Sequence, residues 1–80
     1  MNFIMKEMLE IMIKNLVENA NDVEITETQK EDIITFEVKV ASSDMGKVIG
    51  KQGRVANSIR TVAKAIATKE NKKINIEFVG

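Results

Sequence analysis

The stretch that decides the fold is Val48-Ile49-Gly50-Lys51-Gln52-Gly53-Arg54. It joins two segments of helical character through a loop with a glycine at each end, and each glycine is followed at once by a basic residue. Glycine has no Cβ, so Gly50 and Gly53 can adopt backbone angles that other residues avoid and can let a ligand approach the main chain. The stretch therefore predicts a tight turn that is also a docking surface.

Phosphate is the ligand that this turn predicts. The amide groups at the start of the second helix have no helical acceptors, and they carry the positive end of the helix dipole. An anion placed there would be held by these amides and by the charges of Lys51 and Arg54. A Gly-x-x-Gly sequence alone is also compatible with a plain helix hairpin, because so short a motif arises by chance.

Composition narrows the chemistry. The 80 residues suffice for one domain with a small core, and they include no cysteine and no histidine. Disulfides, thiolate metal sites and histidine-based catalysis are therefore excluded, and we expect no enzyme, no metal and no cofactor. Residues 1–4 are too short for a signal peptide, and no segment approaches the roughly 20 apolar residues that span a bilayer. A cytoplasmic protein without a membrane partner is the default expectation.

The net charge is zero, but the charges are unevenly distributed along the chain. Residues 1–45 contain four lysines and ten acidic residues, whereas residues 46–80 contain eight basic and two acidic residues. The two halves thus carry charges of −6 and +6. Such an asymmetry indicates a basic binding face, because an anionic ligand responds to the local patch and not to the total.

A stripe of apolar residues near the N-terminus predicts the first helix. The stripe consists of Met5, Met8, Leu9, Met12 and Leu16. Ile4, Ile11 and Val17 lie beside it, and they either widen the core face or form an exposed patch for a second subunit. Residues 19–22 are typical of a helix end followed by a turn.

Two strands follow this helix. Residues 23–28 alternate between β-branched apolar and polar residues, and residues 34–40 show the clearest alternation in the chain. A polar turn over residues 29–32 separates them, so we expect an antiparallel hairpin with one face in water. The acids of this region lack the spacing of a calcium loop and fit a solvated strand face. They are Glu24, Glu27, Glu31 and Asp32.

The second half of the chain predicts two helices and a last strand. Ser42 or Ser43 is placed to cap a short helix, with Asp44 in its first turn. The glycine loop leads into a longer helix, and a basic loop over residues 69–73 precedes an alternating strand over residues 74–78. The apolar face of the longer helix is expected to consist of Val55, Ile59, Val62, Ala63 and Ile66.

The predicted order is helix, strand, strand, helix, helix, strand. The two-helix connection of about thirty residues between the second and third strands has the length expected for parallel neighbours in one sheet. The first strand then takes the outer edge beside the second. We expect a single α+β domain over residues 1–80, with residues 1–4 as a frayed extension and three helices on one face of a mixed three-stranded sheet.

Residues 48–53, with a short helix before and a longer one after, resemble the Ile-Gly-x-x-Gly signature of the KH (hnRNP K homology) domain. The element order resembles the type II arrangement of that domain, and the run from Asp44 to Arg54 is similar to the KhpA family of small, single-domain bacterial KH proteins. The resemblance covers nearly the whole chain. It implies that single-stranded RNA, or DNA, lies between the glycine loop with its helices and the last strand, about four nucleotides at a time.

The resemblance also implies which residues bind the nucleic acid. They are Lys47, Val48, Ile49, Gly50, Lys51, Gln52, Gly53, Arg54, Lys72 and Lys73. Residues 50–53 would clamp the sugar-phosphate backbone, and Val48 and Ile49 would help to form an apolar floor for the bases. The flanking cations would supply charge, with Lys72 and Lys73 in the counterpart of the family's variable loop.

Weak binding by one copy is expected from the residues themselves. The chain has no tyrosine or tryptophan, and Phe36 and Phe78 fall at core-facing strand positions, so aromatic stacking platforms are not predicted. Affinity would come mainly from phosphate contacts, and a shallow site of this kind gains from avidity. The resemblance implies self-association or a larger KH-containing partner, and RNA-chaperone activity tied to cell shape, cell wall biogenesis and division.

A nucleotide-binding enzyme is one rival to this interpretation. Residues 46–52 superficially resemble a P-loop, but the glycine spacing is one residue short. Gln52 also stands where a magnesium-binding hydroxyl is needed. This rival predicts magnesium-dependent ATP binding, which the KH interpretation does not.

Two further rivals remain open. A helix-turn-helix DNA reader would place the helix over residues 55–66 in the major groove, with its outward polar residues facing the bases. Those outward residues are Arg54, Asn57, Arg60 and Lys64. The second rival is a pure protein interaction module whose groove has no nucleic-acid ligand.

Overall fold

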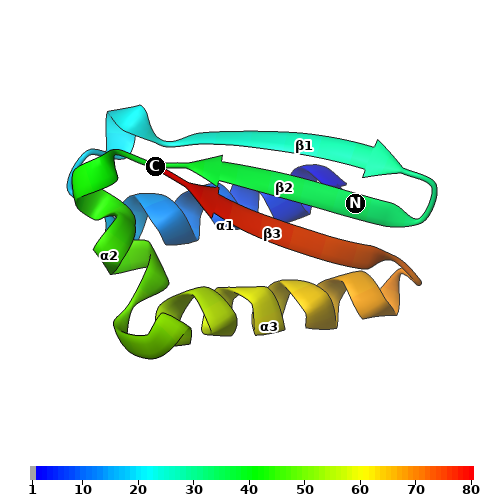
Figure 1. The fold of residues 1–80 in the computed structure, drawn as a ribbon. Helices are drawn as coiled ribbons and strands as arrows, with labels where there is room; N and C mark the ends of the chain where they lie inside the picture. Colours follow the sequence, from blue (N-terminus) through cyan, green and yellow to red (C-terminus); the bar gives the residue numbers. More distant parts are fainter. Residues whose placement is uncertain (1) are drawn as a thin grey trace.

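The computed structural model describes residues 2–80, with side chains from Met5 onward. The predicted contribution of Ile4 to the first helix lies outside the described side chains. The helices and strands are α1 (Asn2–Leu16), β1 (Glu24–Lys30), β2 (Ile33–Lys39), α2 (Met45–Ile49), α3 (Arg54–Lys69) and β3 (Lys73–Val79). Single turns of 3₁₀ helix cover Ala20–Asp22, Ser42–Asp44 and Lys51–Gly53. The order confirms the predicted type II KH arrangement (Figure 1).

The three strands form one mixed sheet in the order β1-β2-β3. β1 and β2 are antiparallel, with Glu24 opposite Lys39 at one end and Lys30 opposite Ile33 at the other. β2 and β3 are parallel, as the long two-helix connection predicts. β3 is thus an edge strand, and its unpaired edge lies beside α3 (Figure 1).

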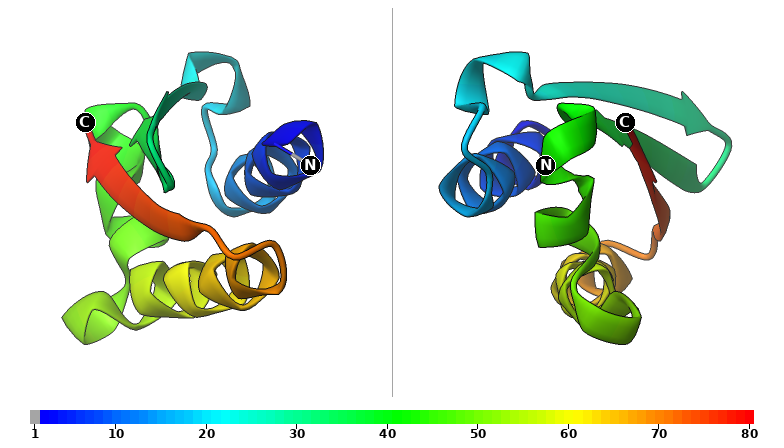
Figure 2. Two further views of the ribbon diagram at one scale, coloured as in Figure 1. Left: turned by 90° about the vertical axis from the view of Figure 1, so that its right-hand side faces the viewer. Right: turned by 60° about the vertical axis from the view of Figure 1, so that its left-hand side comes forward.

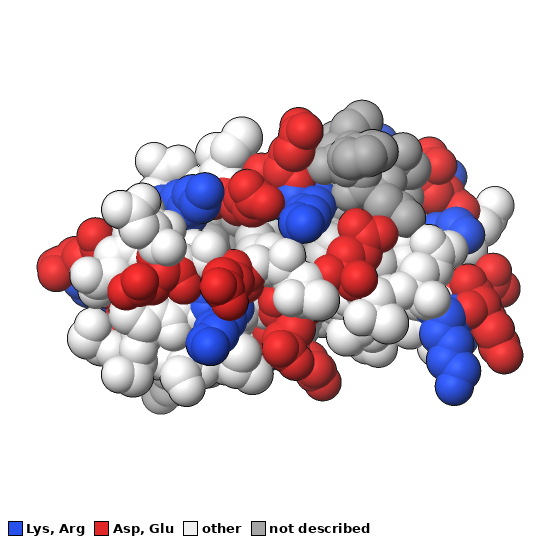
Figure 3. All heavy atoms as spheres, turned by 90° about the horizontal axis from the view of Figure 1, so that it is seen from above, with Lys and Arg blue, Asp and Glu red and all other residues white. Residues whose placement is uncertain are grey.

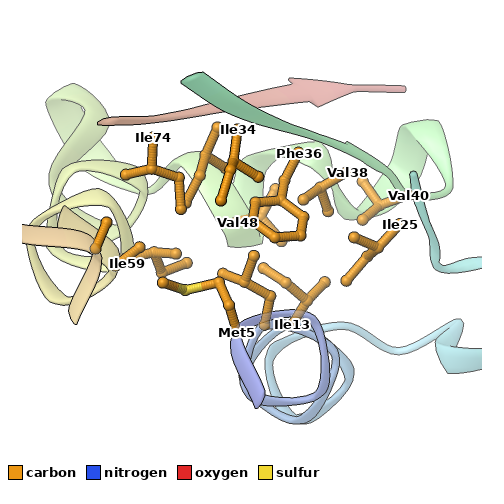
Figure 4. Close-up of a cluster of buried hydrophobic side chains, with 14 residues drawn as sticks. Met5, Ile13, Ile25, Ile34, Phe36, Val38, Val40, Val48, Ile59 and Ile74 are labelled. Carbon is orange, nitrogen blue, oxygen red and sulfur yellow. The ribbon is translucent and has the colours of Figure 1, made fainter. Parts of the chain in front are cut away.

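One hydrophobic core lies between the sheet and the three helices. Figure 4 shows side chains of the strands pointing towards α1 and α3, with Phe36 near the centre and Val48 of α2 beside it. Phe36 and Val48 are both 0% exposed. The opposite face of the sheet carries polar residues in solvent, which is the pattern expected from alternation along each strand.

The hairpin turn is shorter than predicted. Gln29 and Lys30, which the polar pattern assigned to the turn, continue β1 and pair with Ile34 and Ile33. Only Glu31 and Asp32 form the turn, and Glu31 takes a positive φ of 57°. The polar pattern was misleading here, because the exposed face of a strand tolerates polar residues up to the last pair.

The buried stripe of α1 differs in part from the prediction. Met5, Leu9 and Ile13 are at most 2% exposed, whereas Leu16 is 38% and Ile11 is 64% exposed. The fully buried positions of α1 recur every four residues along one line of the helix. Leu16, the last residue of the helix, does not lie on that line. The expected core position of Leu16 is therefore wrong, and Ile11 does not widen the core face but is exposed. Met8, Met12 and Val17 pack partly against the core.

The inner face of α3 is lined mainly by alanine. Ile59 and Ala63 are buried as predicted, and Ala56 and Ala67 are buried with them. Val62, an expected core residue, is 44% exposed, and Val55 and Ile66 are only partly buried. Alanine carries a weak hydrophobic signal, so a pattern based on large apolar residues placed the stripe about a quarter-turn away from its true position.

The short helix α2 begins without the predicted serine cap. Asp44 is its N-cap residue, and no side chain caps the helix. Ser42 and Ser43 lie instead in the preceding 3₁₀ turn. In the described residues no helix has the length and apolar character needed to cross a membrane.

Candidate nucleic-acid interface

The turn between α2 and α3 depends on three residues, among four in sequence, that depart from ordinary backbone geometry. Gly50 has φ 75° and ψ 176°, Gln52 has φ 56° and ψ 26°, and Gly53 has φ 75° and ψ 13°. Positive φ values are readily adopted by glycine and uncommon elsewhere. The turn reverses the chain within a few residues and projects from a corner of the molecule, as Figure 2 shows.

Gly50 is required for a second reason, which is close packing. A Cβ built on Gly50 would overlap the side chain of Val55 and lie 3.0 Å from its backbone nitrogen. A Cβ on Gly53 would meet only Asn57 Nδ2, at an ordinary 3.7 Å. Gly50 therefore lets the first turn of α3 fold back against α2, whereas Gly53 serves the left-handed cap of α3.

Lys51, Gln52 and Arg54 are exposed around this turn, as the prediction of a cationic loop requires. The first amides of α3 lack acceptors within the helix, so they add donors and the positive end of the dipole at the same place. Ile49 is half-buried and can offer part of an apolar surface. Val48 is 0% exposed, so it supports the turn from beneath and has no surface to offer a base.

Lys47 belongs to a separate network that ties α2 to the end of α1. Asp44 is 1% exposed, and its carboxylate accepts hydrogen bonds from the backbone N–H of Glu18 (3.2 Å) and of Asn19 (3.0 Å). Nδ2 of Asn19 donates to the same carboxylate at 3.0 Å. Lys47 Nζ lies 2.7 Å from Glu18 Oε1 and 3.7 Å from Asp44 Oδ1. The predicted RNA-binding cation Lys47 is thus already paired.

This network changes two pKa values. Burial raises the pKa of Asp44, but the hydrogen bonds from Asn19 and Glu18, together with the charge of Lys47, lower it below the ordinary 3.8. The contact with Glu18 raises the pKa of Lys47 above 10.5 despite some burial. Both groups therefore stay charged at neutral pH, and the network holds α2 in place.

A trough runs between α3 and the free edge of β3, and α3 itself begins directly after the glycine turn. A hollow of about 180 Å³ is lined by Arg60, Lys64, Ile74, Asn75, Ile76 and Glu77. A second hollow of about 320 Å³ shares Lys64, Ile74 and Asn75 with the first and is completed by Thr68, Lys72 and Lys73. Shared walls make the two hollows one continuous path, which ends at the predicted cations Lys72 and Lys73.

The basic loop at the far end of the trough is shorter than predicted. Lys69 ends α3 and Lys73 begins β3, so only three residues connect them. Lys72 donates its backbone N–H to Ala67 O at 3.0 Å, and Asn71 takes a positive φ of 58°. The loop is therefore a tight helix-end turn, and its lysines occupy fixed places on the trough wall.

Arg60 lines the trough from α3 and reaches across to β3. Its Nε donates to Ile76 O at 3.2 Å, and its Nη1 donates to Asn57 Oδ1 at 3.3 Å. The guanidinium carbon lies 5.3 Å from the centre of the Phe78 ring. Arg60 thus turns towards β3, which corrects its predicted place on the outward face of α3 as a DNA-reading residue.

The charge asymmetry of the sequence is also an asymmetry in space. Figure 3 views the molecule from the side of β1, opposite α3, and acidic groups are spread widely over this face. The glycine turn and the basic trough lie on the opposite side (Figure 1). In the described residues no group of three or more acidic side chains is arranged to hold a metal ion.

Comparison with known proteins decides the family. Residues 6–78 match the family described as KhpA/KhpB, KH domain. The chain belongs to the KhpA/KhpB family of KH domains. The glycine turn between α2 and α3 therefore lies within a KH domain, which a plain helix hairpin does not account for.

Relatives of this KH domain match along nearly their whole length. "RNA-binding protein KhpA" of Clostridium perfringens is 55% identical over 75 residues, which cover 94% of this chain and 100% of the relative. The protein of the same name from Caldanaerobacter subterraneus subsp. tengcongensis is 48% identical with the same coverage. That of Chlamydia trachomatis is 40% identical over 94% of this chain and 96% of the relative.

The P-loop rival fails on the geometry of the same KH turn. Gly46, the first glycine of the superficial match, lies inside α2, and its carbonyl accepts a hydrogen bond from Gly50 N–H at 2.9 Å. A phosphate-binding P-loop needs that segment as an open loop.

The sequence did not reveal Arg60, Lys64 and Phe78 as parts of the trough or of its wall. These three residues are brought together only by the packing of α3 on β3.

Proposed function

We propose that this chain binds single-stranded RNA, with single-stranded DNA as a weaker alternative, along the path from the glycine turn to Lys72 and Lys73. The observation that carries the proposal is a glycine turn with exposed Lys51 and Arg54 at the start of α3, the same helix that forms one wall of a trough lined by cations. The relatives named RNA-binding protein KhpA support the choice of RNA. No catalytic step is part of the proposal.

The glycine turn is proposed to clamp the sugar-phosphate backbone. Gly50 and Gly53 leave the main chain open to a ligand, and the first amides of α3 supply hydrogen-bond donors. Lys51 and Arg54 add charge-assisted contacts to phosphate oxygens, which are about twice as strong as neutral ones. Gln52 is held in a left-handed conformation at the tip, so its exposed amide also faces the ligand side.

The rest of the strand is proposed to follow the trough between α3 and β3. Ile49 offers an apolar surface beside the turn, and Lys64, Lys72 and Lys73 lie farther along the path. Unstacked bases of single-stranded RNA can turn towards such a surface, whereas the bases of duplex RNA stay paired and stacked inside the helix. Unpaired RNA is therefore the better fit.

Reversal of charge at the turn tests this assignment. We expect the double variant Lys51→Asp, Gln52→Asp to lose at least about tenfold in RNA affinity, since each phosphate contact contributes on the order of 1 kcal/mol or more. Both side chains are exposed, and aspartate tolerates a left-handed backbone, so the fold should persist. Fluorescence anisotropy with a labelled unpaired RNA and thermal melting provide the two readouts.

A matched control separates local contact from total charge. The variant Asn21→Asp, Lys30→Asp changes the net charge by the same amount at two exposed positions away from the trough. We expect this control to bind RNA within about twofold of the wild type. If a folded Lys51→Asp, Gln52→Asp variant still binds as well as the control, the clamp assignment is wrong.

We further propose that the chain works in an assembly in the cytoplasm. The partner is a second copy or a larger protein that carries a KH domain of its own, because a shallow trough binds weakly alone and gains from linkage. RNA-chaperone activity with effects on cell shape, cell wall and division belongs to the same proposal. Exposed apolar residues such as Ile11 and Val62 provide surface for such contacts. Analytical ultracentrifugation with and without RNA tests self-association, and a strictly monomeric protein under both conditions would contradict the second-copy form and leave only the larger partner.

A further inference from the structure

Arg60 is more firmly held than a cation that only attracts phosphate needs to be. Its side chain is half-buried, and two of its five N–H donors are used by Ile76 O and Asn57 Oδ1. The ring of Phe78 lies on one side of the guanidinium at 5.3 Å. A long, flexible side chain is thus fixed in one place on the wall of the trough.

This arrangement supplies what the composition lacks. The chain has no tyrosine or tryptophan, and Phe36 is completely buried. A guanidinium is planar and weakly hydrated, and nucleobases stack on it as they do on aromatic rings. Arg60 contacts the ring of Phe78 and also lines the hollow between α3 and β3, so a ligand in that hollow meets the guanidinium.

The surroundings of Arg60 suit a base better than a phosphate. The hollow that Arg60 lines has Ile74 and Ile76 in its wall, and Lys64, Asn75 and Glu77 complete it. A carboxylate only accepts hydrogen bonds, so Glu77 repels a phosphate, whereas it can accept from the amino group of a base. The hollow therefore offers a flat cation, apolar wall and polar acceptors together.

We propose that Arg60, backed by Phe78, is a stacking platform for one nucleobase of the bound strand. The proposal rests on the proposed binding of single-stranded RNA and adds a base-dependent contact to a site otherwise based on phosphates. It places one base in the hollow between α3 and β3 while the backbone of the strand is held at the glycine turn. Sequence reasoning could not foresee it, since Arg60 and Phe78 are brought together only by the packing of α3 on β3.

Abasic substitution in the RNA separates stacking from charge. The probe is a labelled unpaired RNA of roughly four nucleotides, the length of the expected site, and a series in which each nucleotide in turn lacks its base. For the wild type we expect one abasic position to weaken binding about fivefold to hundredfold, the range for loss of one stacked base. In Arg60→Lys, which keeps the charge and loses the plane, that ratio should fall below about twofold while the salt dependence is unchanged.

Phe78→Leu provides the second variant. It keeps an apolar side chain against the core but removes the ring behind the guanidinium, so the abasic ratio should shrink although Arg60 is intact. Lys14→Arg, at an exposed position of α1 outside the residues that line the trough, is the control, and its abasic ratio should equal that of the wild type. Melting temperatures of all variants show whether the fold is retained.

Each result of the abasic series either supports or overturns the stacking platform. An abasic ratio near one in the wild type, or a ratio unchanged in both Arg60→Lys and Phe78→Leu, would overturn the stacking platform while the RNA-binding proposal stands. Equal weakening of intact and abasic RNA by Arg60→Lys would show that Arg60 acts as a structural or phosphate-binding residue. Failure of the wild type to bind intact RNA would instead contradict the proposed function, and the platform with it.

Discussion

At the scale of single residues, the backbone needs glycine at one position near the turn, Gly50, and does not need it at another, Gly46. Gly50 combines a φ of 75° with a packing contact that leaves no room for a Cβ, whereas a Cβ on Gly46 would meet nothing within 4 Å. Gly46 also lies in the regular part of α2. The backbone therefore needs glycine at Gly50 and only tolerates it at Gly46.

We predict that Gly50→Ala lowers the free energy of unfolding by about 1–3 kcal/mol, because the variant forces a side chain into a left-handed backbone and into Val55. Gly46→Ala, the control, should raise it by about 0.5–1 kcal/mol, since alanine is the better helix former. Urea denaturation measures both. Equal effects of the two substitutions would show that the turn is not under the constraint described.

Lys47 and Lys51 test how far a cation near the turn contributes to binding. Lys51 is exposed, whereas Lys47 is paired with Glu18 and Asp44. We expect Lys51→Met to make the slope of log K against log salt shallower by about 0.7, the value for one contact on single strands. Lys47→Met should change that slope much less, and an equal change for both would show that Lys47 also contacts phosphate.

At the scale of elements, α2 is held by a buried carboxylate. Asp44 accepts three hydrogen bonds from Glu18 and Asn19, which directly follow α1. The position of the glycine turn therefore depends on a segment that is distant in sequence. A short helix of five residues has little stability of its own. The tether therefore explains how so short an element can present an ordered turn.

The pH dependence of stability follows from the lowered pKa of Asp44. A carboxylate whose pKa is lower in the folded state stabilises the fold above its unfolded pKa of about 3.8, and that contribution is lost as the pH falls through the lower, folded value. We predict that Asp44→Asn is less stable than the wild type at pH 5 to 7 and that the gap narrows below about pH 3.8. Urea denaturation across this range measures the gap. A gap that is constant down to pH 2 would contradict the assigned role.

The elements also show what a sequence can and cannot reveal. The alternation in β2 and the glycine turn are local signals, and both predicted the structure correctly. The buried face of α3 was displaced towards Val62, because its alanines carry little signal. Burial of Asp44 and the meeting of Arg60 with Phe78 depend on packing between distant segments, and neither leaves a periodic trace in the chain.

At the scale of the whole molecule, a neutral protein presents one basic side. Ten of the twelve acidic residues lie in residues 1–45, and eight of the twelve basic residues lie in residues 46–80, which include the glycine turn, α3 and β3. Because solvent-exposed charges act over about 10 Å in moderate salt, the ligand senses the nearby basic side more than the distant acidic one. A net charge of zero is thus compatible with binding a polyanion.

Salt dependence and strand preference belong to this scale. If about three phosphates are contacted, log K should fall against log salt with a slope of about −2. Unpaired RNA should bind more tightly than duplex DNA of the same length, since the trough has no element shaped for a major groove. Competition anisotropy measures both quantities, and a preference for duplex DNA would favour the helix-turn-helix rival.

The most direct test of the central claim is a titration of the ¹⁵N-labelled protein with a short unpaired RNA at low ionic strength, followed by NMR. The amide signals of residues 49–54 should move first and farthest, and those of the β1–β2 hairpin turn should stay in place. If the signals of residues 49–54 remain unmoved at saturation, the glycine turn does not hold the backbone of the nucleic acid.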